Sequence, residues 1–330
     1  MSAYIMLQAA EPDDFTMNSR VHPKYKTRYR VTNWSEYDQA LVQRGDITMW
    51  ISPAAIKGWT AKPSGRCGAP QKVSDLAIGT ALTLRLVFRL PLRQAEGFLR
   101  SLLSLMDLSL EAPDHTTMSR RSRGLDVHLE LVSSKKPIHL IIDSTGLSIV
   151  GEGEWAAAKH GKRGKRGWRK LHIGVNRQGK ILAQVMTEST GDDANTGLAI
   201  IKATKGRLAS VTGDAAYDTR QIYARAASRG ARVVVPPVQS ATATGRGPRS
   251  AQRNRTVRRI DKVGRRRWKK ESGYHRQGTV ENAFFRYKTM LGDRLHARGL
   301  AAQKTKVAIG CKVLNRMLDC GRPKSVAVTA

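Results

Sequence analysis

The sequence predicts an α/β fold: a mixed β-sheet with flanking helices, preceded by a helical N-terminal region. Two observations lead to this prediction. Between residues 72 and 123, apolar side chains recur at helical spacing. From residue 138 onward, short β-type runs alternate with helical segments, which is typical of a sheet whose antiparallel strands lead into a parallel portion through helical crossovers. The helical region therefore comes first in the chain and the sheet second.

The helical region comprises residues 71–134 and follows a poorly defined N-terminal segment, 1–70. It predicts three helices, and Asp114 begins the last and shortest of them. The exposed side of this third helix carries Ser, Thr, Arg120 and Arg121. Three short helices that end in a polar, basic one resemble a helix-turn-helix, so residues 71–134 are a candidate DNA-binding region. The alternative is a plain helical bundle that supports the sheet.

The sheet is expected within residues 135–320, which contain a basic, mobile or DNA-ordered insertion at 239–273 and are followed by a short tail, 321–330. Its first strand is a nearly continuous apolar run, as expected for a strand buried on both faces. The expected elements, in chain order, are strands at 138–142, 170–175 and 181–187, a helix at 193–204, a strand at 208–212, a helix at 219–228, a strand at 232–235, a helix capped by Thr279 and a last helix at 302–318.

The chain is strongly basic. Its 330 residues include 58 Lys and Arg against 26 Asp and Glu, which gives a formal charge of +32 at pH 7. Self-repulsion of this size calls for an anionic partner, and nucleic acid is the obvious one. No apolar run of about 18 residues could span a membrane, and the first ten residues do not resemble a secretory signal. We therefore expect a cytoplasmic protein that binds nucleic acid and no membrane.

Three acidic residues stand out against this basic background. Asp143 and Asp214 each follow an apolar strand, and the carboxyl ends of strands are where open sheets bind ligands. Glu281 would supply a third carboxylate from a helix, with Lys288 seven positions later on the same helical face. Oxygen ligands of this kind hold Mg²⁺, and a pair of such cations promotes phosphoryl displacement. Taken singly, each Asp is more often a turn or cap residue, so the prediction depends on the combination.

A glycine-spaced basic segment, 159–170, follows the first strand. Glycine lets the backbone approach phosphates, and Trp168 is expected to stack on an unpaired base. The alternative is a solvated basic loop with Trp168 packed on the sheet. The side chains expected to contact phosphates are those of Lys159, Lys162, Arg163, Lys165, Arg166 and Arg169.

Several other polar residues are interpreted as structural. The expected helix caps are Asp192, Asp193 and Asp218, although Asp218 could instead support the metal site from behind. His139 and His172 alternate within predicted strands, so both are expected to be satisfied sheet residues and not general bases.

The residues around the third acid carry a specific resemblance. The segment 274–288 resembles the motif Tyr-x2-Arg-x3-Glu-x6-Lys of bacterial insertion-sequence DDE transposases, in particular the IS-five family. The matching positions are Tyr274, Glu281 and Lys288, while Gln277 occupies the place of the motif's Arg and Arg276 precedes it. The segments 143–146 and 213–218 also resemble that family's first and second blocks. The resemblance covers roughly residues 70–320.

This resemblance implies a ribonuclease-H-like catalytic domain in which Asp143, Asp214 and Glu281 are catalytic and hold Mg²⁺, with Mn²⁺ as a possible substitute. One cation, between the two aspartates, would activate the nucleophile; the other, between Asp143 and Glu281, would stabilise the leaving 3′-oxygen. The enzyme would cleave the ends of an insertion sequence and transfer their 3′-hydroxyls to target DNA. The residues expected to contact DNA in the third block are Tyr274, Arg276, Gln277 and Lys288.

The implied partners are double-stranded DNA, as the terminal inverted repeats of the element and as the target, and further copies of this chain in a dimer or larger assembly. The implied location is the bacterial cytoplasm, in association with the nucleoid. Two alternatives remain open from the sequence. One is a non-catalytic DNA-binding protein derived from a transposase, and the other is a nuclease of the same fold that cuts without joining.

Overall fold

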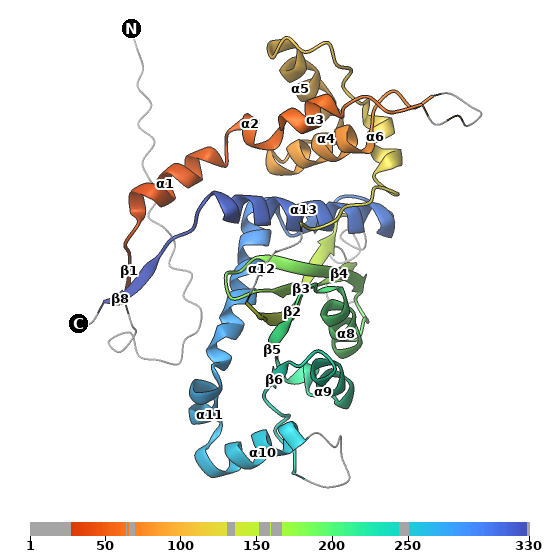
Figure 1. Ribbon diagram of the computed structural model, residues 1–330. Helices are drawn as coiled ribbons and strands as arrows, with labels where there is room; N and C mark the ends of the chain where they lie inside the picture. Colours follow the sequence, from red (N-terminus) through yellow and green to blue (C-terminus); the bar gives the residue numbers. More distant parts are fainter. Residues whose placement is uncertain are drawn as a thin grey trace.

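A computed structural model describes residues 28–63, 65, 70–130, 136–151, 159, 167–243 and 251–328 (Figure 1). It contains a six-stranded mixed sheet with helices on both faces, and a unit of N-terminal helices that lies beyond the last long helix. The mixed α/β class and the flanking helices are therefore confirmed. The arrangement is consistent with the ribonuclease-H-like fold that the resemblance implies.

The order of the sheet is β4-β3-β2-β5-β6, and β7 pairs with the far end of β2. The β2·β3 and β3·β4 pairs are antiparallel, whereas β5, β6 and β7 run parallel to their partners. The strands are β2 (Ile138–Ile149), β3 (Trp168–Val175), β4 (Ile181–Glu188), β5 (Leu208–Thr212), β6 (Arg232–Val234) and β7 (Arg294–Leu295).

β2 is the centre of the sheet and is buried on both faces. Leu140 and Ile142 pack into a core cluster under α8 and α9, whereas Ile141 and Leu147 belong to a second cluster on the opposite face. This is why the sequence of β2 is apolar without alternation. The strand is longer than predicted, because it continues to Ile149 through its pairing with β3 and β7 after β5 has ended.

Two helices cover one face of the sheet, α8 (Asp193–Ala203) and α9 (Arg220–Ala227), and α9 follows a short 3₁₀ helix, η3 (Ala215–Tyr217). Asp192 caps α8 by accepting a hydrogen bond from the Asn195 amide, as predicted. Asp193 is not the cap, because it is already inside the helix. The cap of α9 is Thr219, so the prediction that Asp218 caps this helix was wrong.

The other face is covered by α12 (Gly278–Leu291) and α13 (Leu300–Cys320). Thr279 does not cap α12, because the 3₁₀ helix η4 (Tyr274–Gln277) continues directly into it without a side-chain cap. The side-chain amide of Asn315 on α13 bonds both the N–H and the carbonyl of Ile181, which fixes α13 to the edge strand β4.

The N-terminal helices share one core with this second face. Buried residues of α4 and α5 belong to the same cluster as those of β2, β3, α12 and α13. The predicted helical region and the predicted sheet domain therefore share one hydrophobic core. Ser74 and Asp114 cap α4 and α6, as the sequence indicates. The helices of this unit are α1 (Trp34–Gln43), α2 (Ile47–Trp50), α3 (Pro53–Lys57), α4 (Asp75–Val87), α5 (Leu92–Leu105) and α6 (His115–Arg121).

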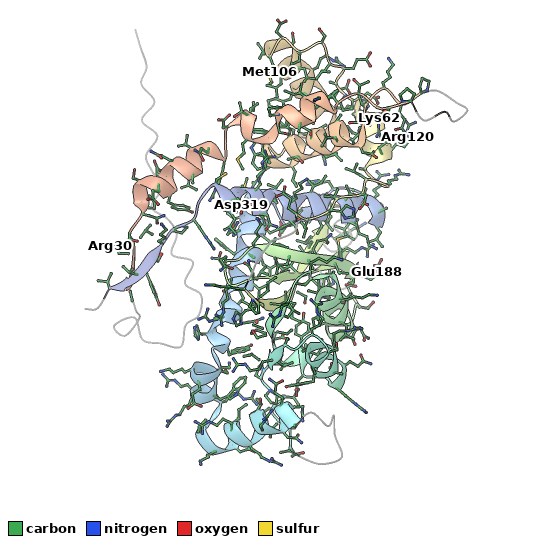
Figure 2. The ribbon with its side chains drawn as sticks, in the orientation of Figure 1. Arg30, Lys62, Met106, Arg120, Glu188 and Asp319 are labelled. Carbon is green, nitrogen blue, oxygen red and sulfur yellow. The ribbon has the colours of Figure 1, made fainter. Side chains whose placement is uncertain are left out.

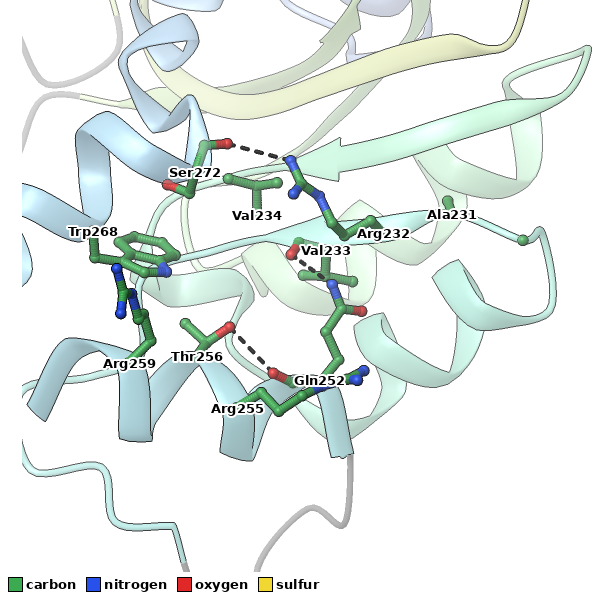
Figure 3. Close-up of a pocket in the computed structure, with 11 residues that line it drawn as sticks. Ala231, Arg232, Val233, Val234, Gln252, Arg255, Thr256, Arg259, Trp268 and Ser272 are labelled. Carbon is green, nitrogen blue, oxygen red and sulfur yellow. Dashed lines mark hydrogen bonds between the residues drawn. The ribbon is translucent and has the colours of Figure 1, made fainter. Parts of the chain in front are cut away.

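The insertion that the sequence predicts to be mobile or ordered by DNA contains two helices, α10 (Ala251–Val263) and α11 (Arg265–Ser272). Arg253 on α10 forms a buried ion pair with Asp218, with nitrogen–oxygen distances of 2.9 to 3.1 Å. Gln252 donates to the Val233 carbonyl on β6, at 3.0 Å (Figure 3). These contacts occupy Asp218 fully and attach the insertion to the edge of the sheet.

The predicted tail contains a strand. β8 (Ser325–Val328) pairs antiparallel with β1 (Arg28–Val31), so two segments from opposite ends of the described chain form a two-stranded ribbon. The short run Ser-Val-Ala-Val suits a strand, but its partner lies almost 300 residues away, and nothing local announces the pairing. Among the described helices, none is long and apolar enough to cross a membrane.

Candidate active site

The first two predicted acids come together where β5 ends beside β2. The last β2·β5 pair is Ile141 with Thr212, so Asp143 on β2 and Asp214 just after β5 emerge at the same edge of the parallel pair. Gly213 is required at this point, since an added Cβ would lie 2.7 Å from the buried Tyr217 ring. The carboxyl edge predicted from the sequence therefore exists, although β2 itself continues.

Each aspartate is held by a backbone amide. Asp143 accepts a hydrogen bond from the Ser144 N–H at 2.7 Å, and Asp214 accepts one from the Ala216 N–H at 3.0 Å. Both bonds use Oδ1, the first within strand β2 and the second as the cap of η3, and they fix the orientation of the carboxyl groups. The second oxygen of each group is left for another ligand.

Glu281 approaches from the opposite direction, on the first turn of α12. The position of that helix depends on Gln277, which is buried and donates from Nε2 to the Ile142 carbonyl at 3.2 Å. Ile142 immediately precedes Asp143, so this bond joins the segment that carries Glu281 to the strand that carries Asp143. The Gln277 contact in the structure is thus with the protein backbone.

The charges of the other two acids act on Asp143. The pKa of Asp143 is raised to about 6, by burial in the first place and also by the negative charges of Asp214, Glu281 and Asp193, against the opposing effect of the Ser144 amide. Burial also raises the pKa of Asp214, together with the charge of Asp193. Within the described part of the chain, Asp143, Asp214 and Glu281 form no ion pair with Lys, Arg or His.

Tyr274 lies beside the same three carboxylates. Burial raises the pKa of its phenol to about 12, and Asp214, Asp143 and Glu281 each contribute to the shift. The Lys269 ammonium sits over the Tyr274 ring, 5.1 Å from the centroid. A pocket of about 450 Å³ brings Tyr274, Lys269 and Glu281 together with His275 and Gln277. Acidic and basic groups therefore border one opening, as phosphodiester chemistry requires.

The donor set fits a hard divalent cation in chemistry and charge, because three carboxylates gather without a basic partner in a chain of net charge +32. In the conformation of the described residues, no three Asp, Glu, His or Cys side chains are grouped closely enough to hold a metal ion. Glu281 is exposed, so it is the member with room to change its rotamer.

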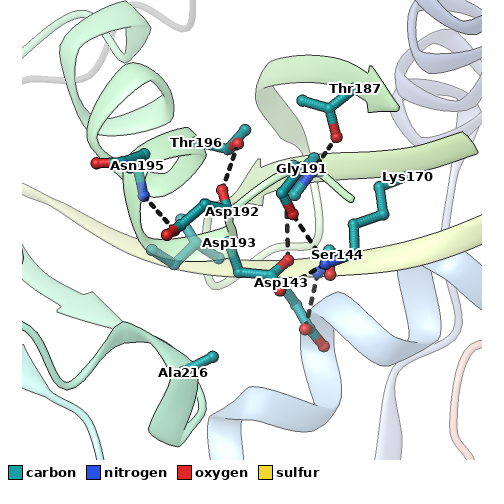
Figure 4. A network of polar contacts seen from close by, with 12 residues as sticks. Asp143, Ser144, Lys170, Thr187, Gly191, Asp192, Asp193, Asn195, Thr196 and Ala216 are labelled. Carbon is teal, nitrogen blue, oxygen red and sulfur yellow. Dashed lines mark hydrogen bonds and ion pairs between the residues drawn. The ribbon is translucent and has the colours of Figure 1, made fainter. Parts of the chain in front are cut away.

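A polar network that sequence reasoning missed supports Asp143 from behind (Figure 4). Asp193 accepts hydrogen bonds from the Ser144 hydroxyl and from Lys170 Nζ, the latter at 2.8 Å. Burial opposes the ionisation of Asp193, but these two bonds outweigh it and keep its pKa below the usual range. The buried His172 completes the network, with Nδ1 3.5 Å from Asp193 and Nε2 3.0 Å from the Thr187 hydroxyl.

Both histidines lie in the sheet, as predicted. His139 Nδ1 contacts the Ser210 hydroxyl at 2.8 Å, and the pKa of each imidazole is lowered, by burial in the first place. For Asp193 the sequence signal was present but local: it precedes an amphipathic run, as caps do. Its actual partners lie on β2 and β3, and only the strand register Ser144↔His172 brings them opposite each other.

The predicted DNA contacts occupy several different environments. Trp168 is 41% exposed and rests against Gly146, while Arg169 pairs with Glu188 and Gln303. Arg121 is turned inward onto Asp75 and the Val73 carbonyl. The remaining described members with at least partial exposure are Arg120 (Figure 2), Lys159, Tyr274, Arg276 and Lys288. Four predicted members lie outside the described residues: Lys162, Arg163, Lys165 and Arg166.

Comparison with known families agrees with this geometry. A family model described as a transposase DDE domain matches residues 134–316, more than half of the chain and the part that contains all three acids. A second model with the same description matches residues 42–152, which extends from the N-terminal helices to just beyond Asp143. The chain therefore belongs to the transposase DDE-domain family.

Proposed function

We propose that this transposase belongs to the IS-five type of bacterial insertion sequences and that Asp143, Asp214 and Glu281 are its catalytic, metal-binding residues. It cleaves the ends of its element and joins the 3′-hydroxyls to target DNA. The observation that carries the proposal is the convergence of the three acids on Tyr274, without a basic counterion, beside a basic pocket wall.

Asp143 is the central ligand in this scheme, because it lies on the middle strand and the charges of both other acids raise its pKa. Asp214 holds its position from the end of β5, and Glu281 completes the set from α12 by a change of rotamer. Mg²⁺, or Mn²⁺ in its place, would supply activation of the attacking hydroxyl and stabilisation of the leaving oxygen. The chain's own basic residues hold the DNA while this happens.

The protein surface around the acids supplies that grip. Tyr274 and Lys269 border the pocket, and Arg276 and Lys288 follow on the same segment. Trp168 is the first residue of β3, near the end of the basic segment 159–170. We retain residues 71–134 as a DNA-binding region in which Arg120 is exposed and free to contact DNA, whereas Arg121 is already paired with Asp75. Two element ends must be held together for joining, so the proposal includes a dimer on DNA in the bacterial cytoplasm.

A plasmid that carries the DNA flanking the natural gene tests the proposal. Asp143→Asn, Asp214→Asn and Glu281→Gln should each lower Mg²⁺-dependent cleavage by about 10³-fold or more, since groups that act as a unit fail together. DNA affinity in EDTA should not fall. Asp38→Asn removes an exposed acid on α1 and serves as the matched control.

Each alternative gives a different product pattern. Nicks that depend on the three acids but never yield joined DNA would identify a nuclease. Tight DNA binding by a wild-type protein that cuts under no metal condition would identify a non-catalytic binder. Wild-type cleavage by all three variants would exclude the proposed metal site.

A further inference from the structure

A second site candidate lies away from the acids, between the N-terminal helices and the last helix. It is a cavity of about 740 Å³ bounded by α4, the start of α5, the end of α6, the turn at 291–299 and α13. The floor is apolar and includes Leu82, Leu86 and the fully buried Met118. No residue of the predicted catalytic set lines this cavity.

The charge of the cavity is one-sided. Its lining contains one acidic residue, Asp293, against six basic side chains that come from four separate segments. The six are Arg85, Arg89, Arg123, Arg294, Arg298 and Lys306. A solvated surface carries such charges at little cost, but a concave wall of low dielectric concentrates their field and attracts anions.

Two of these cations are enclosed without an acidic partner at hydrogen-bonding distance. The Nε of Arg85 is buried, with no hydrogen-bond partner among the described residues, and burial lowers the pKa of its guanidinium. The pKa of Lys306 is lowered to about 8, by burial in the first place and then by the charge of Arg85, against the opposing charge of Asp293. Lys306 donates to the Arg294 carbonyl, which orients its ammonium but does not neutralise it.

The backbone at the rim is strained. Arg89 has a φ of 53°, in the left-handed region that non-glycine residues rarely adopt, and its guanidinium donates to the carbonyls of Thr289 and Met290. Strain of this kind persists where surrounding structure enforces it, and it is common at ligand sites. Here it holds one more basic side chain at the mouth of the cavity.

The cavity also lies within reach of DNA bound at the acids. Its 291–299 wall includes β7, which pairs with β2 at Ser148 and Ile149. Ser148 is five residues beyond Asp143, so the two places are about 17 Å apart along one strand at roughly 3.3 Å per residue. A DNA duplex rises about 3.4 Å per base pair, so the spacing corresponds to about five base pairs.

We propose that this cavity binds the phosphodiester backbone of the DNA on which the transposase acts, with Arg85 and Lys306 as its inner phosphate ligands. The proposal rests on the DNA-binding part of the proposed function and not on the catalytic role of the acids. A phosphate would supply the negative charge that these two half-buried cations lack. It would also bridge α4 to α13, so that DNA binding stabilises the packing of the N-terminal helices on the catalytic domain.

The test measures affinity in EDTA, where no cleavage occurs, on a duplex taken from the DNA flanking the gene. Arg85→Met and Lys306→Met should each weaken binding by about tenfold and lower the slope of log affinity against log salt by about one. Lys304→Met removes an exposed charge two residues from Lys306, on the same helix but outside the cavity, and should have a smaller effect. Lys306→Arg keeps the charge and should restore most of the affinity.

Thermal unfolding separates a ligand site from a structural one. Loss of a half-buried charge that has no acidic partner should leave the Tm of both Met variants at or above that of wild type, whereas loss of a structural contact would lower it. Affinity and salt slope equal to those of Lys304→Met would overturn the proposal. The proposal would also be overturned if inorganic phosphate raised the Tm of the wild-type protein while both Met variants bound DNA as tightly as wild type. Asp143→Asn in the same assay keeps this outcome separate from any failure of the catalytic proposal.

Discussion

The acidic site and the basic cavity are opposite in charge but alike in physics. Both hold several charges of one sign in partly buried surroundings, and in both burial moves a pKa toward the neutral form. The pKa of Asp143 rises to about 6, and that of Lys306 falls to about 8. The buried Asp218–Arg253 pair differs from both, because each of its charges is neutralised within the protein. A cluster left uncompensated is thus a mark of a ligand of opposite charge, and a compensated pair is a mark of architecture.

The two sites also differ in how they are built. The acids stand on adjacent strands and on one helix bonded to them through Gln277, so their spacing depends on backbone hydrogen bonds. The basic side chains stand on helices of two units, and their spacing depends on the packing of α4 against α13. We therefore expect the backbone of the first site to be rigid, with Glu281 adjusting only its side chain, and the second site to respond to any shift of the N-terminal helices.

The largest expected effect comes from the compensated pair. Arg253→Met leaves the Asp218 carboxylate buried without its ion-pair partner and should lower the free energy of unfolding by about 3–5 kcal/mol. Urea denaturation measures it, with Arg258→Met, an exposed arginine of the same helix, as the control. The double change Asp218→Asn with Arg253→Met should recover part of the loss. Equal stability of the Arg253 and Arg258 variants would contradict the distinction drawn above.

A smaller effect, on the Mg²⁺ requirement of cleavage, is expected when Asp193 behind the acidic site is changed. Asp193→Asn removes the charge that holds the Ser144 side chain next to Asp143, so it should raise the Mg²⁺ concentration for half-maximal cleavage by about 10- to 100-fold. The neighbouring Asp192→Asn affects only a helix cap and should cost stability without moving that concentration. An unchanged Mg²⁺ requirement in Asp193→Asn would show that the network does not position Asp143.

The smallest effect is a stability gain from Asp143→Asn in EDTA. Because the folded pKa of Asp143 is raised, its ionisation costs stability; this cost grows as pH rises from about 4 to 6 and is fully present above 6. A pKa raised by about two corresponds to a loss of at most about 3 kcal/mol in the free energy of unfolding, and screening by solvent reduces this loss to about 1 kcal/mol. Tm measured from pH 4 to 8 should show the variant gaining on wild type across that window.

The comparison extends to the opposite sign of charge. For Lys306, whose folded pKa is lowered, the cost is present below about pH 8 and disappears as pH rises from 8 toward the ordinary lysine value. Lys306→Met should therefore gain stability over wild type at pH 7 and lose that gain at pH 10. If Asp143→Asn and Lys306→Met both had a lower Tm than wild type at neutral pH, neither charge would be destabilising in the folded protein.

The sequence predicted the sheet and its acids because their signals are local. The bounds of β5 were found to the residue, and Asp143 and Asp214 were singled out by the small residues that follow apolar runs. The length of β2 was not found, because its second half is a strand only through pairing with β3 and β7. Thr279 was misread for a similar reason, since a 3₁₀ helix already supplies the turn that a cap would begin.

The rest of the candidate site depends on contacts between distant segments. Asp193 and Lys170 are 23 positions apart, and the residues of the basic cavity span positions 82 to 309. No periodicity in the sequence relates such positions. Arg253 illustrates the same limit: nothing in the sequence distinguishes it from the other basic residues of the insertion, and only its place opposite Asp218 shows that it is structural.

The shared core of α4 and α13 has a consequence for biosynthesis. More than 200 residues separate the end of α4 at Val87 from the start of α13 at Leu300. At roughly 5–20 residues per second, the ribosome needs on the order of 10 to 40 s after completing α4 to reach α13, the helix that packs against it. During that interval the nascent N-terminal helices expose apolar surface, so chaperone capacity, and not only transcription, sets how much active enzyme accumulates.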